Sequence, residues 1–283
     1  MNLKISVVTP SFEQAQFLPA TMASIHEQSY PNIEHIVIDG GSTDGSAEIV
    51  KSNEDHLAYW ISEQDDGQTD ALIKGFERST GDIQCWLNSD DLFEPWTLHE
   101  VGRYFEDHPE VEFVYGDSTW IDQDGGVIKP KREHYFNRFI WMHDHNFIPQ
   151  PSTFWRRSLY ERVGGLDSHF DLAMDADLWI RFADETKPRH VRRNWSRMRF
   201  YPEQKNTRFR TASLEEVEAI RGRYQQKDSS QMSRVKTTAA RSTRVGLKLI
   251  TGCYSTQELK LHLNGLRGRG WESDRLNDQD ADQ

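Results

Sequence analysis

Short apolar runs alternate with helical patterns over the first 115 residues of the chain. The runs are rich in β-branched and aromatic residues and have the length of strands; they cover residues 5–8, 33–38, 59–62, 83–87 and 111–115, and the last closes on Gly116-Asp117. Between them, apolar residues recur at helical spacing, as Phe17, Met22 and Ile25 do. Strands that alternate with helices build βαβ units, so this half predicts an α/β fold with a mostly parallel sheet flanked by helices.

The second half of the chain has a less regular pattern. Asp124-Gly125-Gly126 predicts a hairpin turn between strands at 118–121 and 127–129. A further strand is predicted at 152–155, and helices at 157–163, from Asp177 onward and at 215–224. Residues 229–250 carry five basic residues, no acid and apolar residues near helical spacing, which predicts a basic helix ahead of a polar tail. We therefore expect a main domain over residues 1–225 and a C-terminal helical extension with a polar tail over 226–283.

Polar residues follow each of the first four predicted strands. The four segments are Thr9-Pro10-Ser11-Phe12, Asp39-Gly40-Gly41-Ser42, Asp65-Asp66-Gly67-Gln68 and Asn88-Ser89-Asp90-Asp91. The carboxyl ends of parallel strands share one edge of a sheet, and open α/β sheets bind their ligands at that edge. One polar turn alone says little, but four on the same edge predict a ligand site.

The composition narrows the classes of protein. Hydrophobic residues make up 36% of the 283 residues and aromatic residues 11%, so the chain can form a substantial core. The formal net charge of -11 argues against nonspecific nucleic-acid binding, and we expect no nucleic-acid partner. The two cysteines make no disulfide framework. No run of about 18 apolar residues occurs and the N-terminus has no leader pattern, so a cytoplasmic protein is expected.

Asp90 and Asp91 are adjacent acids directly behind a predicted buried strand, and three interpretations of them compete. They can cap a helix that begins near Leu92, because acids favour a helix N-terminus. They can be a hydrolase carboxylate pair, which needs two carboxyl groups that face each other across a bond. They can also hold Mg²⁺ or Mn²⁺, since one or two carboxylates together with substrate phosphates suit these cations.

His143 and His145 resemble two metal ligands on a strand, where both rings would point to one face. A dedicated zinc site needs further cysteine or histidine ligands at set spacing, and none is obvious in this sequence. We therefore favour histidines of an acceptor site or a loop over a metal pair.

Five motifs occur in an order that resembles one known family. They are TPSF at residues 9–12, DGGSTDG at 39–45, DGQTDA at 66–71, WLNSDD at 86–91 and MDADLW at 174–179. Each motif is weak alone, but together they resemble family 2 glycosyltransferases with the A-type glycosyltransferase fold, GT-A. The resemblance covers roughly residues 3–224. It implies a Rossmann-like sheet and a nucleotide-sugar donor.

The resemblance also implies which residues bind the nucleotide. The end of the first strand and Asp39 would hold the base and ribose, and Asp66 with its neighbours would complete the pocket. Asn88-Ser89-Asp90 occupies the family's Asp-x-Asp position, which makes Asp90 the first candidate for a metal ligand and Asp91 the second. The full set of implied nucleotide-binding residues is Thr9, Pro10, Ser11, Phe12, Asp39, Asp66, Gln68, Asn88, Ser89 and Asp90.

An inverting mechanism with Asp175 as the catalytic base is a further implication of the resemblance. A bound Mn²⁺ or Mg²⁺ would stabilise the charge that builds on the departing diphosphate. The acceptor hydroxyl is a weak nucleophile and needs a carboxylate to take its proton, a role that Asp175 matches; Asp177 is expected to cap or pin the helix. The expected donor is a uridine diphosphate sugar. The expected acceptor is a glycan or a lipid-linked hydroxyl, in the building of a surface polysaccharide or glycan.

The chain departs from the family's pattern near the expected metal site. Asn88 stands where the family commonly has aspartate, and its amide can bond a ribose hydroxyl or a metal-bound water. Tyr201 takes the place of a histidine that often reaches the metal or diphosphate, and Leu72 replaces an arginine of many members. Trp179 fits a core position better than a sugar-stacking platform. The candidates for diphosphate or acceptor contacts are Tyr201, Lys205, His145, Gln150 and Trp179.

Alternatives to the transferase follow from the same residues. Asn88 and Tyr201 also suit a non-catalytic nucleotide- or sugar-binding protein on the same fold, although such a protein needs no base. A sugar-phosphate nucleotidyltransferase would need a glycine-rich basic loop after the first strand, where this chain has TPSFE. The basic segment 232–250 suits either a helix packed on the catalytic domain or an amphipathic helix on an anionic membrane, which would bring the protein to the inner membrane face.

Overall fold

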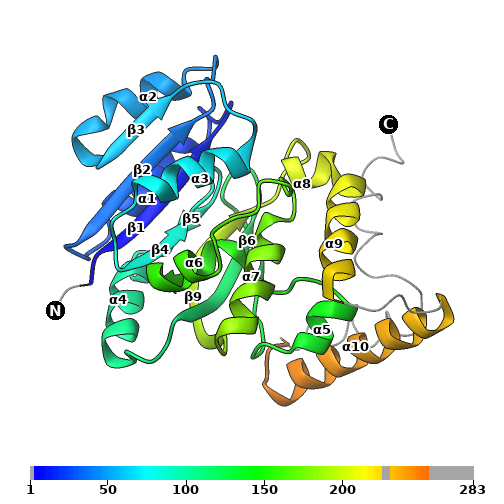
Figure 1. Cartoon of the computed structure of the whole chain (residues 1–283). Coiled ribbons are helices and arrows are strands. Elements are labelled where there is room, and N and C mark those ends of the chain that lie inside the picture. The colour runs from blue at the N-terminus through cyan, green and yellow to red at the C-terminus, as the bar shows by residue number, and fades with distance from the viewer. Residues whose placement is uncertain (1–2, 225–229, 255–283) are drawn as a thin grey trace.

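The first half of the chain forms the parallel part of a curled sheet in the computed structural model, which describes residues 3–224 and 230–254 (Figure 1). All neighbouring strands in this part are parallel, and they lie in the order β3-β2-β1-β4. The register pairs Ser11 with Asp39 and Val8 with Trp86, so the turns behind these strands emerge at one edge. The strands are β1 (Ile5–Ser11), β2 (Ile33–Asp39), β3 (Tyr59–Ser62) and β4 (Ile83–Trp86), and the helices between them are α1 (Leu18–His26), α2 (Ser46–Ser52), η1 (Glu54–His56) and α3 (Gln68–Arg78).

Both faces of this sheet are covered. Along β2, Ile36 and Ile38 belong to the main core, whereas Val37 packs with Leu18 and Met22 of α1 on the other face. Successive side chains of a strand point to opposite faces, so a strand buried on both sides reads as a continuous apolar run. The predicted α/β fold, with a Rossmann-like sheet flanked by helices, is confirmed.

The second half of the chain extends the sheet beyond β4. In order, the added strands are β8 (Thr153–Arg156), β6 (Phe113–Ile121), β9 (Arg189–Arg199) and β5 (Leu92–Phe93), and β7 (Val127–Lys131) pairs with β6. β6 runs parallel to β9 and antiparallel to β7 and β8, so this part of the sheet is mixed. The predicted hairpin between β6 and β7 is present, whereas β9 was not predicted from the sequence.

The prediction that a strand closes at Gly116-Asp117 is wrong, because β6 continues through these residues to Ile121. The glycine gives room for β9: a Cβ atom on Gly116 would lie 2.6 Å from the ring of Trp195. Gly116 therefore serves the close approach of two strands and not a turn.

Two further expectations about local structure are wrong: the helix cap at Asp90 and Asp91, and the shared strand of His143 and His145. Asp90 and Asp91 do not cap a helix, because β5 follows them directly and α4 begins only at Thr97. His143 and His145 do not share a strand: His143 is the last residue of α5, a helix capped by the side chain of Asn137. The helices of this half are α4 (Thr97–Asp107), α5 (Arg138–His143), η2 (Gln150–Ser152), α6 (Arg157–Arg162), α7 (Met174–Glu185), α8 (Lys205–Arg208), α9 (Arg210–Tyr224) and α10 (Ser230–Ile250).

An aromatic cluster joins α7 to the sheet. The rings of Trp86 and Trp179 stack with centroids 5.3 Å apart, and Phe113 stacks on the same Trp179 at 5.3 Å. Trp155 packs against both tryptophans. Trp179 has no exposed surface, so it belongs to the core and its ring is not available as a platform for an acceptor sugar. Stacked and edge-to-face rings of this kind stabilise beyond their buried area.

α10 lies against α5 (Figure 1), and charged pairs join it to the ends of α5 and of the loop behind β7. Lys248 lies 3.0 Å from Glu133, and both side chains are buried. Arg244 lies 2.7 Å from Asp144, and Arg241 pairs with the same carboxylate at 3.2 Å. The interpretation of this segment as a helix packed on the main domain therefore fits its inner face. The predicted polar tail at the end of the chain lies outside the described residues.

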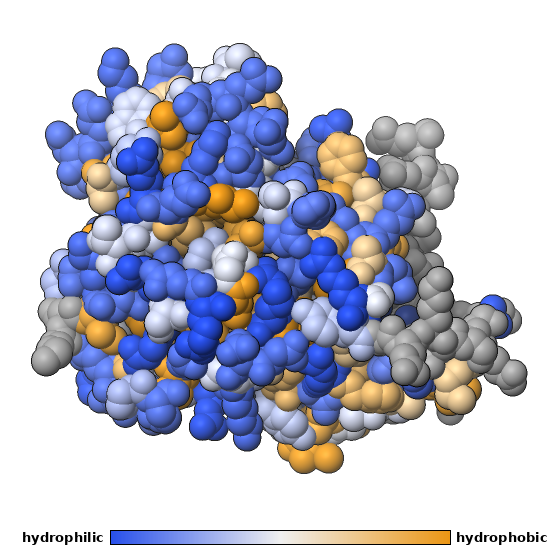
Figure 2. All heavy atoms as spheres, in the orientation of Figure 1, coloured by the Kyte–Doolittle hydropathy of each residue, from blue (hydrophilic) through white to orange (hydrophobic). Residues whose placement is uncertain are grey.

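The surface shown in Figure 2 is mostly hydrophilic, with scattered hydrophobic side chains. In residues 3–224 and 230–254, no helix combines the length and apolarity needed to span a bilayer.

A buried histidine links β1, β2 and α1. Nε2 of His35 lies 3.0 Å from the hydroxyl of Thr9, and its Nδ1 lies 2.9 Å from Nε2 of His26. Burial, together with the nearby His26, lowers the pKa of His35 to about 3. The folded protein therefore contains His35 with a neutral ring at neutral pH.

The pKa of His35 predicts that the protein loses stability as the pH falls from about 6.5 towards 3. In this window the unfolded chain binds a proton that the folded chain excludes, so the free energy of unfolding decreases by up to about 1.4 kcal/mol per pH unit. Urea unfolding of His35→Gln should show a flatter pH dependence, with the exposed His99→Gln as a control. Equal slopes in wild type and His35→Gln would contradict the assignment.

Candidate active site at the carboxyl edge of the parallel strands

The end of β1 contributes two side chains to the edge. Phe12 is 61% exposed, and the hydroxyl of Ser11 is buried without a hydrogen-bond partner among the described residues. Thr9 is fully buried with its hydroxyl engaged by His35, and Pro10 is also buried within β1. The side chain of Thr9 is therefore not available to a nucleotide, because it is fully buried and its hydroxyl is bonded to His35. Nucleotide contacts of Pro10, Ser11 and Phe12 stay a prediction.

Asp39 orders the turn behind β2. Its carboxylate accepts hydrogen bonds from the backbone N–H and the hydroxyl of Ser42 at 3.0 and 2.6 Å, and from the hydroxyl of Ser62 at 2.6 Å. The following Gly41 has a positive φ of 78°, which favours glycine. Asp39 thus holds a preformed turn beside Ser11, at the edge where the sequence predicts the base and ribose.

Three amide side chains form a chain of hydrogen bonds across this edge. Gln68 donates to Oδ1 of Asn88 at 2.8 Å, and Asn88 donates to Oε1 of Gln150 at 3.2 Å. Gln150 in turn donates to the carbonyl of Trp86 at 2.8 Å. The structure therefore brings these three predicted residues together, whereas the neighbouring Asp66 is exposed.

The two adjacent acids have different partners. Asp91 is 1% exposed and accepts the backbone N–H of Arg199 at 2.8 Å, so it fixes the end of β9. Asp90 accepts the hydroxyl of Tyr201 at 3.0 Å and the amide of Gln204 at 3.4 Å. Ser89 between Asn88 and these acids is buried, and its carbonyl accepts the hydroxyl of Thr21.

The pKa values of both acids are raised, although the positive charge of Arg199 acts in the opposite direction on each. Burial raises the pKa of Asp90, and burial together with the neighbouring Asp90 raises the pKa of Asp91 well above its usual range. Arg199 meets these acids through its backbone N–H, which Asp91 accepts, and through its Nε, which donates to the carbonyl of Asp90 and not to a carboxylate oxygen. Within the described residues, no group of three metal-ligating side chains occurs. Asp90 therefore suits a divalent cation whose other ligands are substrate phosphates or water.

Tyr201 and Lys205 take different positions at this edge. The hydroxyl of Tyr201 donates to Asp90 and accepts from Gln14 at 3.4 Å, and burial raises its pKa, so it stays protonated. Lys205 is paired with Asp171, 2.6 Å from its Oδ2. Gln14 and Gln204 were not singled out in the sequence, because only the folded chain brings Gln14 to Tyr201 and Gln204 to Asp90.

Asp175 lies in the first turn of α7 and is partly buried. Its Oδ2 accepts the side-chain amide of Asn146 at 2.9 Å, and its Oδ1 accepts the N–H of Ala176 at 2.7 Å. Burial raises the pKa to about 6, although these two hydrogen bonds act in the opposite direction. A carboxylate with this pKa is ionised at neutral pH and is basic enough to accept a proton.

The segment around Asn146 connects the acids to Asp175. Asn146 bonds Asp175, and Gln150 four residues later bonds Asn88 ahead of the acids. His145 lies apart from this contact, with its Nδ1 3.3 Å from Asp144 on the side of α10. Asp177 is fully buried and pairs with Arg181, consistent with a role in pinning the helix.

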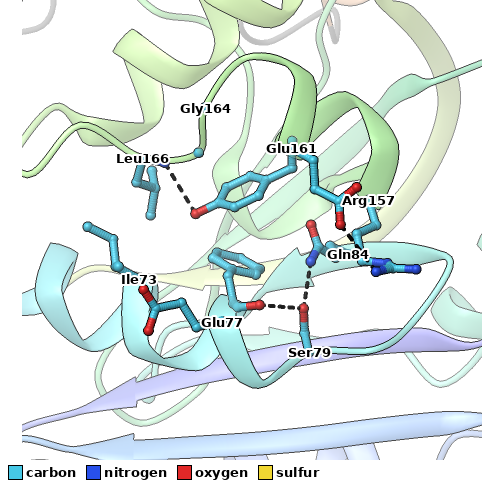
Figure 3. A pocket seen from close by; sticks show the side chains of 11 residues that line it. Ile73, Glu77, Ser79, Gln84, Arg157, Glu161, Gly164 and Leu166 are labelled. Carbon is cyan, nitrogen blue, oxygen red and sulfur yellow. Dashed lines mark hydrogen bonds and ion pairs between the residues drawn. The ribbon is translucent and has the colours of Figure 1, made fainter.

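A separate cavity of about 370 Å³ lies between α3 and α6 (Figure 3). Gln84 and Ser79 on its wall are hydrogen bonded to each other, and Arg157 and Glu161 form an ion pair at its side. Gln84 belongs to β4 and precedes Trp86, whereas the acids follow it. The cavity is therefore distinct from the edge that carries Asp90.

Comparison with known proteins gives one family. The family model described as "Glycosyl transferase family 2" matches residues 6–164. Among curated proteins, the chain is 30% identical over 190 residues to "Uncharacterized glycosyltransferase MT1564" of Mycobacterium tuberculosis (strain CDC 1551 / Oshkosh), an alignment that covers 66% of this chain and 72% of the relative.

Solved structures share the fold. Staphylococcus aureus TarS 1–349 in complex with UDP aligns with a TM-score of 0.62 and 15% identity, over 93% of this chain and 79% of that chain. This chain spans 39% of a longer crystallised TarS chain. Mannosyltransferase PcManGT from Pyrobaculum calidifontis, in complex with GDP-Man and Mn²⁺, aligns with a TM-score of 0.60 and 17% identity, over 94% of this chain and 80% of that chain.

The geometry predicts separate effects for the two adjacent acids. Asp90→Asn should abolish Mn²⁺-dependent binding of uridine diphosphate and raise the free energy of unfolding by roughly 1 kcal/mol, because it removes a like-charge neighbour. Asp91→Asn keeps the acceptor for Arg199 and should retain cation-dependent binding. Calorimetry with Mn²⁺ and with a chelator measures the first effect, and urea unfolding the second. Loss of cation dependence in Asp91→Asn with retention in Asp90→Asn would reverse the assignment.

Proposed function

The chain belongs to glycosyl transferase family 2, and from that membership we propose that it is an inverting glycosyltransferase. It transfers a sugar from a nucleoside diphosphate donor to the hydroxyl of a glycan or lipid-linked acceptor. The observation that carries the proposal is Asp175: a partly buried carboxylate at the start of α7 that accepts hydrogen bonds from Asn146 and the N–H of Ala176 and has a pKa of about 6. A non-catalytic binding protein would have no use for a base with this pKa.

The donor nucleotide binds along the ends of β1 and β2 in this proposal. The exposed ring of Phe12 offers a stacking surface for the base, and the unpartnered hydroxyl of Ser11 offers a hydrogen bond. Asp39 and Asp66 complete the pocket on the ribose side. Uridine diphosphate is the proposed nucleotide, supported by the UDP complex of the structurally similar TarS 1–349.

Asp90 would hold Mn²⁺ or Mg²⁺ against the donor diphosphate. The cation, when bound, neutralises the charge that develops on the leaving phosphates. Asp91 holds the backbone of β9 beside it, and Tyr201 and Gln204 donate hydrogen bonds to the same Oδ2 of Asp90. The Mn²⁺ complex of PcManGT supports a divalent cation here. Lys205 would reach the diphosphate only after leaving Asp171.

Asp175 acts as the general base. It accepts the proton of the acceptor hydroxyl while the hydroxyl oxygen attacks the anomeric carbon on the face opposite the leaving diphosphate. The carbon–oxygen bond to the diphosphate breaks as the new glycosidic bond forms, so the anomeric configuration inverts. Because the base must be ionised, kcat/KM should rise with pH through about 6.

The acceptor side includes Gln150, with His145 as a candidate farther from Asp175. A peripheral membrane contact through residues 232–250 would use the outer face of α10, where Met232, Val235 and Ile250 are exposed. The inner face is occupied, because Arg244 and Lys248 are paired within the protein. A lipid-linked acceptor, a role in polysaccharide biosynthesis and a cytoplasmic location complete the proposal.

Replacing the base tests the proposed function. Asp175→Asn should lower kcat by about a thousandfold, because proton transfer to a positioned base contributes at this scale. Binding of the donor should be unchanged, since Asp175 lies outside the nucleotide edge. Calorimetry with uridine diphosphate and a transfer assay measure the two quantities, with Asp184→Asn on the exposed end of α7 as a control. Full turnover in Asp175→Asn would show that another group is the base.

A further inference from the structure

Asn146 has a defined orientation towards the proposed base. Its Nδ2 donates to Oδ2 of Asp175 at 2.9 Å, while its own Oδ1 accepts the backbone N–H of Ile148 at 3.2 Å. The bond to Ile148 decides which end of the amide faces the carboxylate. Oδ2 of Asp175 accepts the amide of Asn146 and Oδ1 accepts the N–H of Ala176, and a carboxylate has further lone pairs that can meet the hydroxyl of an acceptor.

α10 holds the segment that carries Asn146. Asp144, two residues earlier, has a side chain that is 5% exposed and accepts Nε of Arg244 at 2.7 Å and Nε of Arg241 at 3.2 Å. Although burial raises the pKa of Asp144, the contacts of His145 and Arg244 bring it below its usual range, so the carboxylate is ionised. A buried carboxylate is costly unless it is paired, so these arginines fix where Asp144 lies.

α9 holds the backbone on the other side of the base. Glu216 accepts the N–H groups of residues 171–173, immediately before α7, at distances between 2.8 and 3.2 Å. Arg221 donates to the carbonyl of Asp144 at 2.9 Å. The start of α7 and the segment with Asn146 are therefore both held by helices that follow the last family motif in the sequence.

We propose that Asn146 is a positioning residue for the base, and that α10 keeps it in place through the pairs of Arg241 and Arg244 with Asp144. This inference rests on the proposed role of Asp175. In this proposal α10 is needed for full activity. The segment after the boundary expected near residue 225 therefore contributes to catalysis together with the main domain. A hydroxyl can then be aligned with a carboxylate that has one orientation.

The hydrogen bond from Asn146 favours the charged form of Asp175, so its loss raises the pKa of the base. Glu216 is the charged group of α9 that acts on Asp175, and its negative charge raises the same pKa. Glu216 is unchanged in the variants below, so the shift they produce comes from the Asn146 side.

Asn146→Ala should move the acid limb of the kcat/KM profile to higher pH. At about pH 6 the loss should be about tenfold, and at about pH 8.5 less than about threefold, because the base is ionised there with or without Asn146. Affinity for uridine diphosphate should be unchanged. An equal loss at both pH values, with the acid limb where it is in the wild type, would overturn the positioning role.

Variants of α10 test whether the pairs of Arg241 and Arg244 with Asp144 hold Asn146 in place. Arg244→Met should shift the acid limb in the same direction, with a loss of about threefold at about pH 6. Arg244→Lys should restore most of it, and Arg234→Met on the exposed face of α10 is the matched control. Amide hydrogen exchange at residues 144–148 should accelerate in Arg244→Met, a readout that needs no activity.

A double variant shows whether the arginines of α10 act on Asp175 through Asn146. Adding Arg244→Met to Asn146→Ala should cause no further shift of the acid limb. An additive shift would show that Arg244 acts on the base by another path than Asn146. Other results would show that Asp175 is not the base, and they differ from those that would contradict the positioning role. If Asp175→Asn keeps turnover, the proposed function has the wrong base; if it loses turnover while Asn146→Ala and Arg244→Met keep the wild-type profile, only the positioning role is wrong.

Discussion

The parallel pairing of β1 with β2 and β4 is the constraint on which the rest of the structure depends. It sets Ser11 beside Asp39 and ends β4 at Trp86, so that the polar turns behind three strands meet at one edge. If the pairing of β2 with β1 shifted by one residue, the side chain of Ile36 would leave the main core. The burial of these strands therefore fixes their register. The stack of Trp86 on Trp179 then ties α7, and with it Asp175, to the same sheet.

Asp90, Asp91 and Asp175 share a raised pKa but differ in their partners. Asp91 holds a backbone N–H of β9 and is structural, whereas Asp90 accepts hydrogen bonds from neutral groups. Asp175 is held by Asn146 and the N–H of Ala176 in the first turn of a helix. Keeping such acids buried costs stability, and this cost is consistent with the proposed cation at Asp90 and the proposed proton transfer to Asp175.

The sequence predicts the parallel half well, because continuous apolar runs followed by polar turns identify buried strands and their ends. It does not predict β9, since RHVRRNWSRMR looks like a solvated segment until its arginines meet Glu94 and Glu100, which lie about 100 positions away in the chain. The motifs single out Asp175 as the proposed base, but Asn146 belongs to no motif and meets Asp175 only through folding. The basic segment before residue 250 shows its charge in the sequence, whereas the buried acids that pair with Arg244 and Lys248 are visible only in the structure.

The stereochemistry of transfer tests the central claim most directly. Proton NMR can follow the enzyme as it consumes α-linked uridine diphosphate glucose, uridine diphosphate N-acetylglucosamine or guanosine diphosphate mannose, with water or a simple alcohol as the acceptor. The account predicts that the first product has the β configuration and that its formation stops in Asp175→Asn while donor binding persists. A first product with retained α configuration, or inversion that continues unchanged in Asp175→Asn, would contradict the account.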